Sequence, residues 1–161
     1  MTTPLPAAPT LTLDCRLFAD IQVQVGAPQE VGATPHGQRR LIPILGGQAQ
    51  GQGWTARVLP GGADYQLILS DSLAELDARY VLETDAGDLI YVQNHAIRSG
   101  PPALMARIAR GEPVDPAAIY FRCAPRLACA SPSLRWVSER LFVGTGARYP
   151  DRVALRFLEL L

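Results

Sequence analysis

The sequence predicts an all-β fold, a single closed or nearly closed antiparallel β-barrel of about nine strands with one or two short helices. Apolar residues recur at every second position, as in Ile21, Val23 and Val25, which is typical of strands with one buried face. The segments between the four predicted strands of residues 54–98 are too short for the helices that parallel crossovers need. A sandwich of two sheets would also fit. We favour the barrel because the strand over residues 89–98 carries large side chains on both faces.

The length of 161 residues fits one domain, and 15 basic side chains balance 15 acidic ones. We therefore expect neither a nucleic-acid partner nor attraction to a membrane surface. The proline-rich residues 1–10 are expected to form a flexible segment that precedes a barrel domain over residues 11–161. No apolar stretch approaches the roughly 18 residues of a membrane span, so we expect a cytoplasmic protein.

Alternation begins in the first part of the chain, over residues 11–17 and 21–25. Short runs of the same kind, bounded by turn-forming residues, continue to the C-terminus. The further predicted strands cover residues 39–45, 54–59, 63–70, 75–84, 89–98, 118–127, 141–145 and 152–160.

Three short connections have the composition of hairpin turns. Pro60-Gly61-Gly62 is predicted to join the strands over 54–59 and 63–70. Ser70 to Ser72 and Asp85-Ala86-Gly87 are predicted to join the strands that follow. The four strands over residues 54–98 are therefore expected to form an antiparallel meander.

Two segments between strands have helical features. In "PPALMARIARG", Pro102 suits a first helical turn, Leu104 and Ile108 share a face, and Gly111 is the expected stop. The segment "SPSLRWVSER" could begin a second helix at Ser131, or form a single turn beside a loop.

Several kinds of chemistry are excluded or receive no support. The chain contains no lysine, so neither a Schiff base nor a lysine general base can form. The glycine-rich residues 46–54 lack the Gly-Lys of a phosphate-binding loop and are interpreted as structural glycines of a strand. His36 and His95 lie far apart with no ligand-like spacing. We therefore expect no metal and no cofactor.

Polar side chains interrupt two consecutive predicted strands. Asp64 and Gln66 lie on one face of the first strand, and Arg79 and Glu83 lie on one face of the second. The strands follow one another, so we expect the two polar faces to coincide. If this face points outward, it is a solvated surface with weak ion pairs. If it points into the barrel, Asp64 and Arg79 must pair with each other or bind a ligand.

Other side chains could complete such a site. Arg122 in "IYFRCAP" and the neighbouring Asn94 and His95 in "YVQNHAI" are polar residues in the middle of predicted strands. The large aromatic residues that could form the apolar walls are Trp54, Tyr91 and Trp136.

A set of motifs in fixed order resembles a known family. The motifs are "RRLIPILGG", "VLPGGADYQL", "LDARYVLETDAGDLIYVQN", "YFR" and "LFVGTG", and the chain resembles domain-of-unknown-function family 3237 from about Leu11 to the C-terminus. The resemblance implies a β-barrel that is often oligomeric, and it brings no established reaction. It also implies that Asp64 and Arg122 belong to the characteristic residues of the family. On this ground we expect a homo-oligomer.

These observations favour a barrel whose lumen binds a small aromatic or anionic molecule. Arg79 and Arg122 would supply positive charge, and Asp64 would act as an acid or base in a cofactor-free isomerisation or cyclisation. Two alternatives stay open. One is a non-catalytic carrier, and the other is a structural oligomeric barrel whose lumen is packed shut and holds no ligand.

Overall fold

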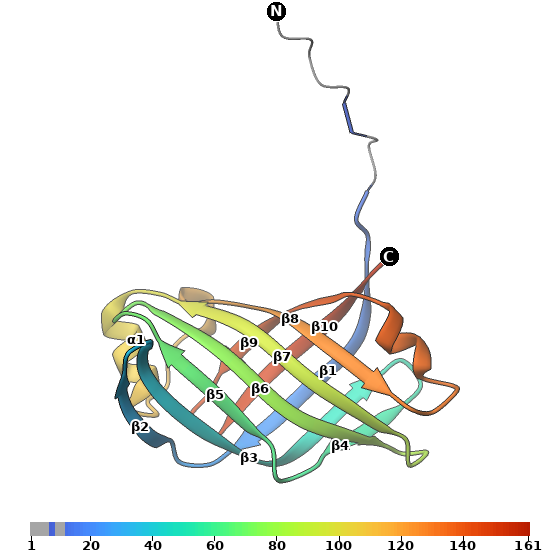
Figure 1. The fold of residues 1–161 in the computed structure, drawn as a ribbon, viewed down its shortest axis with the longest axis horizontal. Coiled ribbons are helices and arrows are strands. Elements are labelled where there is room, and N and C mark those ends of the chain that lie inside the picture. Colours follow the sequence, from blue (N-terminus) through green and yellow to red (C-terminus); the bar gives the residue numbers. More distant parts are fainter. Residues whose placement is uncertain (1–6, 9–11) are drawn as a thin grey trace, which may run out of the picture.

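Long antiparallel strands coil around a common axis and close into the predicted barrel (Figure 1). The computed structural model describes residues 7–8 and 12–161, so most of the predicted flexible segment, residues 1–10, lies outside the described residues. Eight strands make the closed wall, and the fold class predicted from the sequence is confirmed. In chain order the strands are β1 (Cys15–Val25), β2 (Gln29–Thr34), β3 (Gly37–Gly51), β4 (Thr55–Val58), β5 (Ala63–Ile68), β6 (Leu73–Thr84), β7 (Leu89–Ser99), β8 (Tyr120–Cys129), β9 (Phe142–Arg148) and β10 (Arg152–Leu160).

The barrel closes through β1. This strand pairs with β10 on one edge and with the C-terminal half of β3 on the other. From β10 the wall continues through β9, β8 and β7 to β6, with every neighbouring pair antiparallel. Strands β4 and β5 fill the remaining place between β6 and β3.

The predicted hairpin at Pro60 to Gly62 is wrong. Strands β4 and β5 are both antiparallel to β3 and to β6, so they run in the same direction and form one interrupted strand of the wall. Residues 59–62 make a bulge between them. A Cβ atom on Gly62 would lie 2.3 Å from the Arg79 carbonyl oxygen, so only glycine lets the bulge lie against β6. The turns at residues 70–72 and 85–87 join β5 to β6 and β6 to β7 as predicted.

Strand β2 was not predicted, because its residues are mostly exposed and do not alternate. It follows β1 along the same edge of β3 and pairs with β3 alone among the described strands. The partner of β1 on its other edge, β10, begins at Arg152, which lies opposite Gln24. The wall therefore has an opening where the chain passes from β1 into β2.

A short α-helix, α1 (Pro102–Ala109), lies at this end of the barrel (Figure 1). It begins with Pro102, buries Ile108 and stops before Gly111, whose φ is 74°, as the sequence predicted. Of the two alternatives for the segment from Ser131, the structure shows no α-helix but turns and a short 3₁₀ segment, η2 (Arg135–Glu139), which buries Val137. None of the described helices is long and apolar enough to cross a membrane.

Aromatic side chains fill the end of the barrel opposite α1, called the closed end below. The Phe18 ring lies 5.3 Å from Trp54, 6.0 Å from Trp136 and 5.1 Å from Phe142, between ring centroids. Edge-to-face and tilted ring contacts at these distances stabilise the fold by more than the burial of their apolar surface alone. The next inward residues are also fully buried, and they include Leu82, Ile90, Val92 and Phe157. The closed end is therefore a packed core.

We expect replacement of Gly47 by alanine to weaken the closure of the barrel. Gly47 pairs with Val23 across the β1–β3 seam, its φ is 136°, and an added Cβ would lie 2.0 Å from the Gln22 carbonyl oxygen. Gly47→Ala should lower the free energy of unfolding by about 3–4 kcal/mol, because backbone strain and a steric clash add.

Gly32→Ala is the matched control. Gly32 has a φ of 106° but open space around the added Cβ, so only the backbone strain of about 1–2 kcal/mol applies. Chemical denaturation of both variants measures the difference. If both variants lose the same free energy of unfolding, the close contact between Gly47 and β1 does not limit the residue at this position.

Candidate functional site

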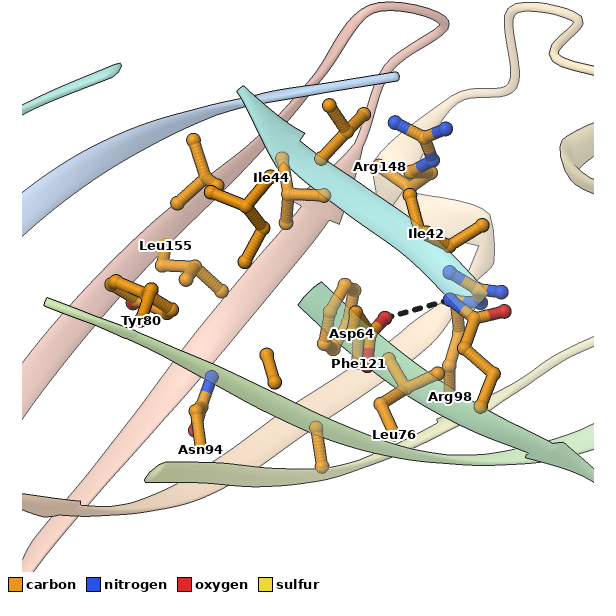
Figure 2. Close-up of a pocket in the computed structure, with 16 residues that line it drawn as sticks. Ile42, Ile44, Asp64, Leu76, Tyr80, Asn94, Arg98, Phe121, Arg148 and Leu155 are labelled. Atoms are coloured by element: carbon orange, nitrogen blue, oxygen red, sulfur yellow. Dashed lines mark hydrogen bonds between the residues drawn. The ribbon is translucent and has the colours of Figure 1, made fainter. Parts of the chain in front are cut away.

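The lumen is hollow at the end where α1 lies. Figure 2 shows the side chains that line the inner part of this space. The inner part, called the inner chamber below, has a volume of about 40 Å³, which is enough for ordered water or a small chemical group. Inward residues of eight strands line it: Val23, Val25, Ile42, Ile44, Asp64, Gln66, Leu76, Ala78, Tyr80, Asn94, Ala96, Arg98, Phe121, Arg148, Val153 and Leu155.

A wider space, called the vestibule below, adjoins the inner chamber and has a volume of about 300 Å³. Its walls come from the β1–β2 connection, the β9–β10 turn and the C-terminal end of α1. Its lining residues are Val25, Gly26, Ala27, Pro28, Arg40, Ile42, Gln66, Arg98, Ile108, Ala109, Arg110, Gly111, Arg148, Pro150 and Asp151. Five of them, Val25, Ile42, Gln66, Arg98 and Arg148, also line the inner chamber. The vestibule therefore leads into the chamber.

Asp64 and Gln66 point into the chamber from β5, two residues apart on its inner face. The Gln66 Nε2 donates a hydrogen bond of 2.7 Å to Asp64 Oδ2. Asp64 Oδ1 and Gln66 Oε1 are buried, and no described residue hydrogen-bonds to them. Burial raises the pKa of Asp64 above its ordinary value, although the Gln66 hydrogen bond and the charge of Arg98 oppose the rise.

Tyr80 of β6 and Asn94 of β7 line the other side of the chamber (Figure 2). The Tyr80 hydroxyl and Asn94 Oδ1 are buried without a hydrogen-bond partner among the described residues. Burial raises the pKa of the Tyr80 hydroxyl well above its usual range, so this group stays protonated and available as a donor.

Arg98 lies near the C-terminal end of β7, at the junction of the chamber and the vestibule. Only 4% of this residue is exposed, and its Nε has no partner among the described residues. The guanidinium lies 6.0 Å from the centroid of the Phe121 ring. Burial lowers the pKa of Arg98 to about 10. The negative charge of Asp64 opposes this change, and the positive charges of Arg148 and Arg40 add to it. Arg98 is therefore still positively charged at neutral pH.

Arg148, the last residue of β9, reaches the same junction. It is half-buried, and its Nη1 donates a hydrogen bond of 3.3 Å to the Arg152 carbonyl oxygen. Burial lowers the pKa of Arg148, while the charges of Asp64 and Asp151 oppose that change. Two arginines thus face one buried carboxyl group.

Every buried side-chain atom without a hydrogen-bond partner in the described part of the chain belongs to a residue that lines the inner chamber. Such atoms are rare in folded proteins, because leaving one unpaired costs about 1–3 kcal/mol. Their five residues are Asp64, Gln66, Tyr80, Asn94 and Arg98. The chamber therefore presents donors and acceptors to whatever fills it.

Two of the predicted site residues, Asp64 and Asn94, line the chamber. The polar face predicted to unite Asp64 with Arg79 does not exist, because Asp64 pairs with Ala78 and directly paired residues share a face. Arg79 lies outside the barrel, where it forms an ion pair of 3.0 Å with Asp77.

The other predicted polar candidates also lie on the outer surface. Tyr91 and His95 are exposed, and the His95 ring hydrogen-bonds to Gln93 at 3.1 Å. Arg122 is exposed and lies over the Tyr120 ring, 5.2 Å from its centroid. None of these side chains reaches the inner chamber.

The two predicted tryptophan walls lie elsewhere. Trp54 and Trp136 both pack on Phe18 at the closed end and line neither the chamber nor the vestibule. The apolar walls of the chamber come instead from aliphatic residues and from Phe121.

Sequence reasoning missed Tyr80, Arg98 and Arg148. Strand parity carried a signal for Arg98, because it has the parity of Asn94 on a strand whose even positions face inward. Arg148 lies beyond the predicted end of its strand at residue 145, so no parity was assigned to it. Over residues 7–8 and 12–161, no group of three or more histidine, cysteine, aspartate or glutamate side chains is arranged to hold a metal ion.

Comparison with known proteins finds similar chains and similar structures. A UPF0311 protein of Rhodopseudomonas palustris is 44% identical over 94% of this chain and 99% of its own length. The crystal structure of a conserved protein of unknown function from that organism has a TM-score of 0.89, with 43% identity over 94% of this chain and 100% of that one. A β-barrel-like protein of Acinetobacter baumannii has a TM-score of 0.80, with 33% identity and complete coverage of both chains.

A more distant structure shares the fold alone. An enzyme from Penicillium herquei has a TM-score of 0.71 at 16% identity, with 98% of this chain and 100% of that one covered. The model of the family described as protein of unknown function (DUF3237) matches residues 9–160, and the chain belongs to this family.

Proposed function

We propose that the inner chamber and the vestibule bind a small organic molecule, and that Asp64 transfers a proton on it without a cofactor. The observation that carries this proposal is the convergence of five buried, unpartnered polar groups on one cavity. A purely structural lumen would be packed with apolar side chains, as the closed end is. Groups that cost free energy to bury are retained where a ligand satisfies them.

Proton transfer is the reaction that these side chains support best. An aspartate whose pKa is raised by burial is a stronger base once it ionises, and it also holds its proton at higher pH. Asp64 would remove a proton from a carbon next to a carbonyl group and return it elsewhere, so that the substrate isomerises. The Tyr80 hydroxyl and the Arg98 guanidinium would stabilise the negative charge that develops on the carbonyl oxygen.

A non-catalytic binding protein is the alternative, and the small volume of the inner chamber favours it. About 40 Å³ accommodates only a small group, so a ligand of ordinary size would lie mainly in the vestibule. Such a ligand would contact Arg98 and Gln66 without placing a carbon atom near Asp64.

The catalytic proposal predicts that the protein exchanges carbon-bound hydrogen for deuterium. In D₂O, NMR of a panel of small ketones and aldehydes should reveal at least one compound whose exchange next to the carbonyl the protein accelerates. Asp64→Asn should lower this rate by about a hundredfold or more, because the amide cannot accept the proton. The rate should rise with pH through an apparent pKa above the ordinary range of aspartate, because the base must be ionised.

Glu75→Gln is the control, since Glu75 is an exposed carboxylate on the outer face of β6. Its exchange rate should equal that of the unmodified protein. Binding of the panel without exchange would favour the non-catalytic alternative, and exchange that is unchanged in Asp64→Asn would show that Asp64 is not the base.

The raised pKa of Asp64 also predicts how stability changes with pH. The folded protein holds the Asp64 proton to higher pH than the unfolded chain does, so this group stabilises the fold at low pH. That contribution is lost as the pH rises through the folded-state pKa. Asp64→Asn removes the loss, and the variant should therefore gain stability relative to the unmodified protein as the pH rises above the ordinary aspartate pKa of about 4.

Denaturant unfolding at several pH values measures this difference. Glu75→Gln reports the effect of removing a solvated carboxylate. If the stability of Asp64→Asn relative to the unmodified protein falls as the pH rises, the folded state favours the ionised carboxylate of Asp64, contrary to this prediction.

A further inference from the structure

The junction between the chamber and the vestibule carries more positive than negative charge. Arg98 and Arg148 both line it, and among the described residues neither forms an ion pair with a carboxylate. Asp64 is the single acidic residue that lines the inner chamber. With Asp64 ionised, the two guanidiniums leave one positive charge unbalanced, and with Asp64 protonated they leave two.

The other charged groups of the vestibule are already paired. Arg40 forms an ion pair of 2.6 Å with Glu30, and Arg110 forms one of 2.6 Å with Glu112. Asp151 forms an ion pair of 3.0 Å with Arg152. The charge of Asp151 also acts on Arg148, but its carboxylate pairs with Arg152, so none of these groups forms an ion pair with Arg98 or Arg148.

Arg98 is oriented as a ligand-binding group. Its guanidinium approaches the chamber at the same end as Asp64 and Arg148, with Ile42 close by (Figure 2). The residue is 96% buried, from an exposed fraction of 4%, and its Nε has no hydrogen-bond partner among the described residues. The Phe121 ring, 6.0 Å away, attracts the cation but accepts no strong hydrogen bond. A buried arginine without a bonded anion is an unusual and costly arrangement.

We propose that this junction binds the carboxylate of a small organic acid between Arg98 and Arg148, an inference that rests on the proposed binding function. A single carboxylate balances the charge that remains when Asp64 is ionised, and it can accept paired hydrogen bonds from a guanidinium. The body of the acid lies in the vestibule, against Val25, Ile42 and Ile108. The proposed ligand is therefore an organic anion and not a neutral aromatic molecule.

Binding of matched pairs of probes tests the assignment. Each pair is a carboxylate and its own primary amide: acetate and acetamide, benzoate and benzamide, phenylacetate and phenylacetamide. Ligand-observed NMR and calorimetry measure their affinities, with inorganic phosphate as a further probe. At least one carboxylate should bind about tenfold or more tightly than its amide, because an amide brings no charge to the arginines.

Variants locate the binding. Arg98→Met and Arg148→Met keep most of the side-chain volume and should each weaken carboxylate binding by about tenfold. Arg79→Met and Arg122→Met, which remove exposed arginines of the outer surface, should leave it unchanged. Thermal melting checks folding, and if Arg98→Met fails to fold, the half-buried Arg148 decides the result.

The other possible results would each refute either the anion site or the choice of a carboxylate. Amides that bind as tightly as carboxylates would refute the anion site and leave the binding function standing. Phosphate that binds more tightly than every carboxylate, with loss in the same two variants, would refute the choice of a carboxylate. The absence of binding by every probe would refute the organic-acid site, and continued deuterium exchange of neutral ketones would then preserve the proposed function.

Discussion

The pairing of β1 with both β10 and β3 is the constraint on which the rest of the structure depends. It removes the free edges of the sheet and gives it an inside. Once the sheet is closed, alternation sends every second side chain into the lumen. Ile21 and Val23 are buried for this reason, and the same rule directs Asp64 and Asn94 inward although both are polar. The site is a consequence of polar residues at inward positions of a closed wall.

Side-chain size then divides the lumen into two parts. At the closed end, large aromatic rings meet around Phe18 and leave no space. Towards α1, the inward positions of β6 and β7 hold Ala78 and Ala96, whose short side chains leave room beside the polar groups. The departure of β2 from the wall opens the same end to solvent. The hollow and accessible part of the lumen therefore lies at one end of one continuous barrel.

Much of this architecture could be predicted from the sequence, because alternation is a local property of the chain. The parity that grouped Asp64 with Gln66 on one face was right. The error lay in the next strand, where the polar residues were assumed to continue the polar face. Register decides that question, and pairing of Asp64 with Ala78 turns Arg79 outward. In this hairpin the register is set by the turn at residues 69–72, and the composition of that turn does not reveal which residues it places opposite each other.

The position of a residue along the barrel axis was equally hidden from the sequence. Trp54 and Trp136 were chosen for their size, and both lie on Phe18 at the closed end. They are the two tryptophans of the chain. The intrinsic fluorescence of this protein thus monitors the aromatic plug, and an unfolding trace recorded by indole emission reports when that plug loosens, whatever occupies the far end.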